Sequence, residues 1–187
     1  MGTQNLTPRP KGLLCTMLAL AGVGTASTTF AQSVNVTATG TITGSCNITS
    51  GSAISLDIGA VPASDFKQVG DVSRQSPTQN IVISCSGNVG VTMNMTGTRA
   101  SGTPTPPKSV IDLTGDGSAG VASGVGVQIL YDGKATPSTP LDLRTDTPIS
   151  YTGNTATIPV AARYYATSAT VSAGTANTTA TLKFTFD

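Results

Sequence analysis

The chain of 187 residues contains no histidine, no tryptophan and no glutamate, and aromatic residues make up only 4% of it. Without histidine it lacks the side chain that titrates nearest neutral pH, and it lacks the imidazole group that commonly binds metals. Every acidic residue is an aspartate, and Asp142 and Asp146 flank a turn without an obvious catalytic partner. These absences argue against an enzyme, so we expect no catalytic, cofactor-binding or metal-binding residues.

A long hydrophobic run is also missing. The longest apolar stretch, residues 13–23, is too short to cross a bilayer as a helix. It follows Arg9 and Lys11 and leads into small residues that end at Ala31, which is the layout of a secretory signal peptide. We therefore expect residues 1–31 to be removed on export, with residues 24–26 as an alternative cleavage site.

Positive charge is scarce once this leader is removed. Eight basic residues then face nine acidic ones, which leaves no basic surface for nucleic acid. Cys15 departs with the leader, so Cys46 and Cys85 remain. An even cysteine count in an exported protein predicts a disulfide, because neither a CxxC spacing nor a histidine supports a redox or metal site. In the loop-entropy model, closing this loop stabilises the fold by about 4 kcal/mol.

What the chain does have is alternation with a period of two, the pattern of β-strands with one buried face. Residues 174–187 alternate to the end of the chain, with Ala180, Leu182, Phe184 and Phe186 in one phase. Residues 33–43 alternate in the same way, with one phase made of Val34, Val36, Ala38, Gly40 and Ile42. We expect both segments to be strands, and neither has an obvious partner within the chain.

Further strands are predicted between these two segments, at residues 46–58 (interrupted), 81–85, 91–95, 110–113, 125–131 and 158–165, with short elements near Leu141 and Tyr151. Residues 65–79 read as a polar loop and residues 115–124 as a flexible glycine-rich stretch. Asp112 and Asp116 hint at a calcium loop, but they lack the further ligands, so a mobile turn is the interpretation we adopt. Many strands without a credible helix favour one all-β sandwich domain.

Several short segments together resemble the type 1 fimbrial (pilin) subunits of the bacterial chaperone-usher pathway. They are Thr39-Gly40-Thr41-Ile42-Thr43-Gly44-Ser45-Cys46, Leu56-Asp57-Ile58-Gly59, Ile83-Ser84-Cys85, Gly124-Val125-Gly126-Val127-Gln128-Ile129, Pro140-Leu141-Asp142-Leu143, Ala162-Arg163-Tyr164-Tyr165-Ala166-Thr167 and residues 171–181. In that family a glycine stands fourteenth from the end and an aromatic residue stands last but one. Gly174 and Phe186 occupy these positions here, with Phe186 in place of the usual tyrosine.

The resemblance implies an incomplete immunoglobulin-like β-sandwich that is completed by a donor strand from another chain. It implies a donor-strand extension at residues 32–45, with Val34, Val36, Ala38, Gly40 and Ile42 as the inserting residues, and a pilin domain at residues 46–187. The acceptor groove would lie beside the C-terminal strand with Gly174, Ala180, Leu182, Phe184 and Phe186. The implied partners are a periplasmic chaperone, an outer-membrane usher and other pilin subunits.

The expected function is therefore a structural subunit of a surface fimbria, polymerised by donor-strand exchange after passage through the periplasm and supporting adhesion and biofilm formation. The alternative is a minor tip or adaptor subunit that binds a glycan. Tip adhesins of this pathway carry an extra N-terminal lectin domain and lack a donor extension, and this favours the structural interpretation. A secreted hydrolase on a sandwich scaffold would need a catalytic pair that we do not find.

Overall fold

The computed structural model describes Thr37, Thr39 and residues 44–187, and every strand among them lies in the unit Thr41–Asp187. The elements are β1 (Ser45–Ser50), the short 3-10 helix η1 (Ala63–Asp65), β2 (Val72–Gln75), β3 (Gln79–Ser86), β4 (Val91–Thr96), β5 (Val110–Ile111), β6 (Val125–Leu130), β7 (Asp146–Ile149), β8 (Thr155–Ala166) and β9 (Thr181–Phe186). Thr37 and Thr39 are exposed and lie in no strand. Within the described residues no helix is long and apolar enough to cross a membrane.

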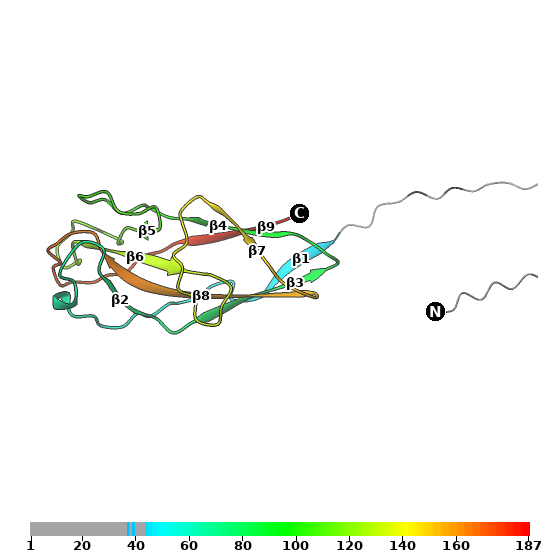
Figure 1. The fold of residues 1–187 in the computed structure, drawn as a ribbon, viewed down its shortest axis with the longest axis horizontal. Helices are drawn as coiled ribbons and strands as arrows, with labels where there is room; N and C mark the ends of the chain where they lie inside the picture. The colour runs from blue at the N-terminus through cyan, green and yellow to red at the C-terminus, as the bar shows by residue number, and fades with distance from the viewer. Residues whose placement is uncertain (1–36, 38, 40–43) are drawn as a thin grey trace, which may run out of the picture. The chain divides into compact units, whose positions relative to one another are not determined.

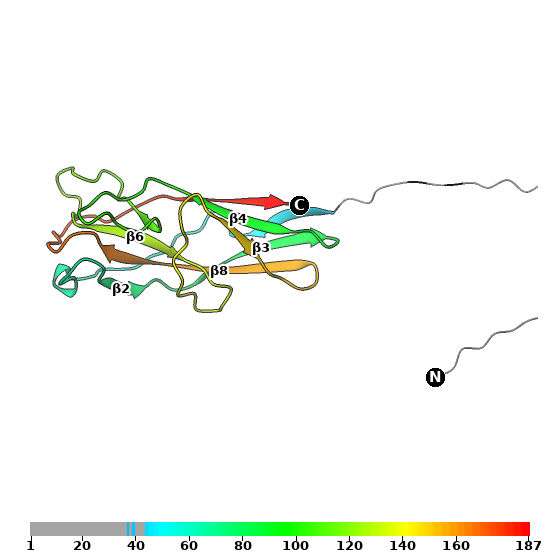
Figure 2. The same cartoon turned by 45° about the horizontal axis from the view of Figure 1, so that its top comes forward.

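The strands form two antiparallel sheets that face each other (Figures 1 and 2). The large sheet has the order β1-β3-β8-β6-β5, with β2 pairing along β8, and the small sheet has the order β7-β4-β9. The expected all-β sandwich is confirmed. In this order β1 and β9 are edge strands of their sheets, which leaves one side of each without a neighbour among the described residues.

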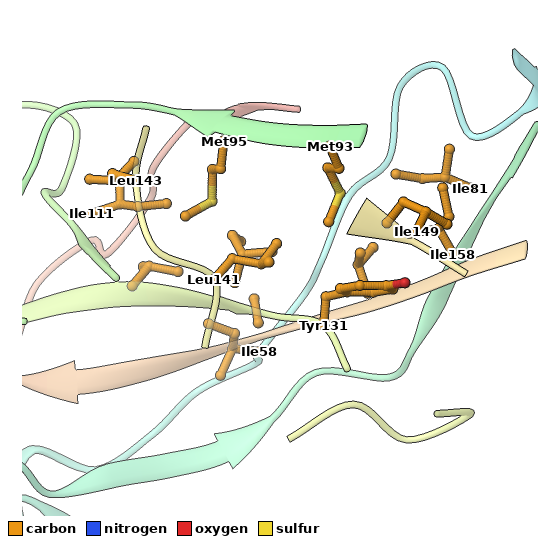
Figure 3. Close-up of a cluster of buried hydrophobic side chains, with 14 of the residues drawn as sticks. Ile58, Ile81, Met93, Met95, Ile111, Tyr131, Leu141, Leu143, Ile149 and Ile158 are labelled. Atoms are coloured by element: carbon orange, nitrogen blue, oxygen red, sulfur yellow. The ribbon is translucent and has the colours of Figure 1, made fainter. Parts of the chain in front are cut away.

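The core lies between the two sheets, and the alternation of the sequence places its residues there. In β4 the phase with Val91, Met93 and Met95 is buried, and both methionines are about 1% exposed. Figure 3 shows them pointing from β4 into the space that they share with Leu141 and Tyr131. Burial of these side chains supplies most of the free energy that holds the sheets together.

Strand β6 is buried on both faces, and the face away from the core packs against the segment that leads into β5. There Leu130 is fully buried, and Gln128 donates to Ser109 Oγ at 2.9 Å while it accepts from Arg163 Nε at 2.9 Å. Both the amide nitrogen and the amide oxygen of Gln128 therefore have hydrogen-bond partners inside the protein. These bonds offset the free-energy cost of burying this polar side chain. Burial lowers the pKa of the Arg163 guanidinium.

The predicted disulfide is present. Cys46 of β1 lies directly opposite Cys85 of β3, with their Cα atoms 4.0 Å apart. It therefore fastens the edge strand β1 to β3, its one sheet partner among the described residues, one residue after β1 begins.

Three expectations about the strands are wrong in detail. The C-terminal strand was expected from Gly174, but it begins at Thr181, because only residues 181–186 pair with β4. The strand expected over residues 46–58 ends at Ser50, since residues 52–58 have no strand beside them. Residues 65–79 are not only a loop: they contain β2, whose Ser73 Oγ accepts from the Tyr164 backbone N–H of β8.

Candidate strand-binding groove

A long groove of about 760 Å³ opens into the interior of the sandwich. One wall is formed by residues 51–58 and the other by residues 176–182 and Phe184. Its floor consists of buried apolar side chains on the inner face of the large sheet, namely Ile81 of β3, Val127 and Ile129 of β6, and Val160 and Ala162 of β8. The groove thus leads from the surface directly to the hydrophobic core.

The C-terminal wall shows one apolar face toward the groove. Ala180, Leu182 and Phe184 are half-buried and line it, whereas Lys183 and Thr185 are exposed and do not line it. Strand β9 pairs with β4 on one side only, from Thr181 opposite Thr96 to Phe186 opposite Val91. Along the groove its backbone N–H and C=O groups have no strand partner among the described residues. Such an edge is a template for another strand.

The opposite wall has the same character. Ile54, Leu56 and Ile58 alternate with exposed residues and turn toward the groove. No backbone-to-backbone hydrogen bond joins residues 52–58 to the rest of the described chain. Extended backbone of this kind normally has partners for its polar groups. Two unpaired walls therefore face each other across one apolar floor.

The groove carries little charge. Asp57 is the only acidic or basic residue among those that line it, and its carboxylate accepts a hydrogen bond from the Gly59 N–H at 2.8 Å. The other titratable group is Tyr164, whose pKa is raised by burial and, to a smaller degree, by the negative charge of Asp57. Its hydroxyl donates to the Ala176 carbonyl at 3.2 Å. An uncharged, apolar occupant fits this surface best, because a charged group would lose its hydration here.

Two residues that were expected at the groove lie elsewhere. Phe186, at the end of β9, does not line the groove and is 36% exposed. Gly174 precedes β9 and lines a smaller recess of about 210 Å³, which shares Tyr164 and Ala176 with the groove. The expected inserting residues Val34, Val36, Ala38, Gly40 and Ile42 lie outside the described residues.

Sequence reasoning missed the first wall and the floor as parts of the site. Ile54, Leu56 and Ile58 have the right alternation, but they were assigned to an ordinary strand. The alternation of these three residues could have indicated a groove wall, because a groove wall is also an alternating segment without a strand beside it.

Among the described residues, no group of three or more Cys or Asp side chains is placed to hold a metal ion. Asp112 precedes the turn that contains Asp116, and burial, followed by the charge of Asp116, raises the pKa of Asp112. The apolar groove between the two walls is therefore the candidate functional site.

Comparison with known proteins agrees with this geometry. The family model described as Fimbrial protein matches residues 24–187. A fimbria adhesin protein of Klebsiella pneumoniae is 29% identical over 174 residues, which cover 88% of this chain and 52% of the relative. The chain thus spans about half the length of the curated relative it matches.

Solved structures show the same fold. An antigen and type I fimbria protein of Burkholderia pseudomallei is similar with a TM-score of 0.53 and 26% identity, covering 78% of this chain and 99% of that one. The CupB6 tip adhesin of Pseudomonas aeruginosa is similar with a TM-score of 0.56 and 22% identity, covering 75% of this chain and 38% of the adhesin. The described domain is thus an immunoglobulin-like sandwich of the kind found in pilus subunits.

Proposed function

Because the chain belongs to the fimbrial protein family, we propose that it is a subunit of a surface fimbria and that its groove is filled by the N-terminal segment of another subunit. The proposed division is a leader at residues 1–31, a donor extension at residues 32–45 and a pilin domain at residues 46–187. Family membership also agrees with the expectation that the chain is not an enzyme.

The observation that carries this proposal is the match between the groove and one segment of the chain. Residues 176–184, along the C-terminal wall, span nine residues, and so do residues 34–42. Residues 34–42 contain no charged side chain, as the groove requires. One of their two faces is apolar or small throughout, whereas the other consists of asparagine and threonine. A strand with such faces buries one on the floor and gives the other to solvent.

The physical state of an empty groove supports the expected partners. Exposed core and two unpaired backbone edges promote aggregation until a strand covers them. A periplasmic chaperone would cover the groove first, and an outer-membrane usher would be where the next subunit's extension replaces it. The proposed location is accordingly the fimbria at the cell surface, reached through the periplasm.

A minor tip or adaptor position, with an adhesive role, is the second candidate. The name of the Klebsiella pneumoniae relative and the fold shared with a tip adhesin favour it. The two candidates use the groove in the same way and differ in whether the subunit can donate a strand as well as accept one.

The test compares the full chain with a variant that lacks residues 33–42. We expect the variant to bind a synthetic peptide of residues 33–45, seen as a higher midpoint of thermal unfolding, because ligands of the folded state stabilise it by mass action. We also expect the variant to be absent from internal positions of the fibre. A peptide with the same composition and a shuffled alternation serves as the control. Equal stabilisation by both peptides, or normal internal incorporation of the variant, contradicts the proposal.

A further inference from the structure

The groove wall formed by residues 176–184 is held in two different ways. Residues 181–184 belong to β9 and are paired with β4. Residues 176–180 belong to no strand, yet all of them line the groove. The first half of the wall therefore needs another support.

The glycine-rich segment provides that support. Its hydrogen bonds reach residues that come just before the first half of the wall and residues that belong to it. We name residues 112–123 together with residues 172–175 the brace. The Ala122 N–H donates to the Thr175 carbonyl at 2.9 Å, and the Thr175 N–H donates to the Gly120 carbonyl at 2.8 Å. Further bonds run from the Thr114 N–H to the Asn177 carbonyl at 2.8 Å and from Thr178 Oγ1 to the Asp112 carbonyl at 2.6 Å. The brace thus fixes the wall from its outer side.

Gly174 is the point of closest approach in the brace. A Cβ atom on Gly174 would overlap backbone atoms of Val121 and Ala122, and it would lie 2.8 Å from the Gly120 carbonyl oxygen. These neighbours are backbone atoms, which cannot move aside as a flexible side chain can. Since no positive φ is involved at Gly174, the requirement for glycine here is one of space.

We propose that the brace positions the first half of the wall for the incoming strand, and that Gly174 is a positioning residue that does not itself touch the strand. The inference deepens the proposed function and rests on it for the identity of the ligand. A side chain at position 174 would separate the two backbones and move residues 176–180 relative to the floor. The inserted strand would then lose contact at this end of the groove.

A matched control exists in β6. A Cβ on Gly126 would meet Val110 Cγ1 at 2.5 Å and the Ile111 carbonyl oxygen at 2.7 Å, so Gly126→Ala creates comparable crowding. Gly126 lies on the outer face of the large sheet, however, and does not line the groove. Comparing Gly174→Ala with Gly126→Ala separates an effect on the groove wall from a general loss of stability.

The experiment measures two quantities on the full chain and both variants. The first is amide hydrogen exchange of Thr114, Ala122 and Thr175, whose N–H groups donate the hydrogen bonds described above, and it requires no ligand. We expect faster exchange of these amides in Gly174→Ala and wild-type exchange of them in Gly126→Ala. The second is dissociation of a labelled peptide of residues 33–45, which we expect Gly174→Ala to accelerate by about tenfold and Gly126→Ala to leave unchanged.

The outcomes are distinguishable. If the wild-type chain fails to bind the peptide, the proposed function is wrong, and the exchange data still decide whether the brace holds the wall. Wild-type exchange of the Thr114, Ala122 and Thr175 amides in Gly174→Ala overturns the inference, as do equal changes in both glycine variants. If Gly174→Ala does not fold, the double variant Ser123→Ala with Thr175→Val replaces it. That variant removes the Ser123–Ser172 hydroxyl contact and the bond from Thr175 Oγ1 to the Gly120 carbonyl, and neither residue lines the groove.

Discussion

Replacing Leu182 by aspartate tests whether the inner face of β9 contacts an inserted strand. Leu182 lies opposite Met95 in the β4–β9 pair and is half-buried at the groove. The control is Thr185→Asp on the same strand. Thr185 is exposed on the other face of β9, opposite Thr92. Its replacement by aspartate therefore adds the same negative charge as Leu182→Asp, but outside the groove.

The expected loss of peptide affinity in Leu182→Asp depends on how far the new carboxylate is buried when a strand fills the groove. A fully buried leucine contributes roughly 1.5–3 kcal/mol, and Leu182 gains only part of this on binding because it is already half-buried. Covering an unpaired carboxylate adds a penalty of several kcal/mol in real proteins. With about 3 kcal/mol as a lower figure, Leu182→Asp should weaken peptide binding by about 100-fold or more.

The assay is a fluorescence anisotropy titration of the full chain with a labelled peptide of residues 33–45. Thr185→Asp should bind within about twofold of wild type, since exposed substitutions usually change free energies by less than about 0.5 kcal/mol. The thermal midpoints of the two empty variants check that both are folded. Equal affinities for Leu182→Asp and wild type would refute the assignment of this face to the inserted strand.

Three further predictions concern the disulfide, the donor segment and one surface loop. Cys85→Ser should lower the free energy of unfolding by about 2–5 kcal/mol, and two free thiols detected by mass spectrometry in the native chain would exclude the bond. In the peptide of residues 33–45, Gly40→Leu should slow binding by forcing a side chain into occupied volume, while Thr39→Leu places the same side chain on the opposite face and should not; equal rates for the unchanged and the Gly40→Leu peptides would remove the steric argument. Partial desolvation raises the pKa of Asp132, but hydrogen bonds from Ser138 and Lys134 outweigh it and lower the pKa to about 2. The stabilisation from a lowered carboxyl pKa is fully present above the unfolded value near 3.8 and disappears as the pH falls through about 2. Asp132→Asn should therefore lower the thermal midpoint at pH 7, and the difference from wild type should shrink as the pH falls from 4 to 2; a difference that is constant over that range would contradict this.

Alternation predicted the faces of the strands better than it predicted their ends. Val91, Met93 and Met95 share one phase and are all buried in β4, as their spacing indicates. The alternation predicts a C-terminal strand from Gly174, but a strand also needs a partner, and β4 supplies one only from Thr181 onward. Pairing depends on where another part of the chain lies in space, and periodicity does not contain that information.

The groove illustrates the same limit. Ile54, Leu56 and Ile58 look like the second half of the strand that begins at Ser45. In the structure that strand ends at Ser50, and Gly51, with φ of 78°, turns the chain away from β3. The apolar phase then lines the groove without a neighbouring strand. The sequence thus shows which side chains are apolar and share one face. Which of them remain partly exposed, because no strand lies over them, depends on the fold.

The brace could not be read from composition. Glycines in residues 115–124 suggest flexibility, and several of the hydrogen bonds that tie this stretch to residues 172–178 are made by backbone groups, which carry no signal of residue type. Only Gly174 could have pointed to the brace, because the family that the sequence resembles has a glycine at this distance from the chain end.

The position of the disulfide determines how the domain would carry a mechanical load. In a fibre joined through residues 32–45, tension enters the domain at Gly44 and reaches Cys46 two residues later. From there a covalent bond passes it to Cys85 in β3, so the hydrogen bonds between β1 and β3 need not resist it in succession. Pulled from this end, the oxidised domain should extend only after β3 itself leaves the sheet, whereas the reduced domain should first release β1 at a lower force.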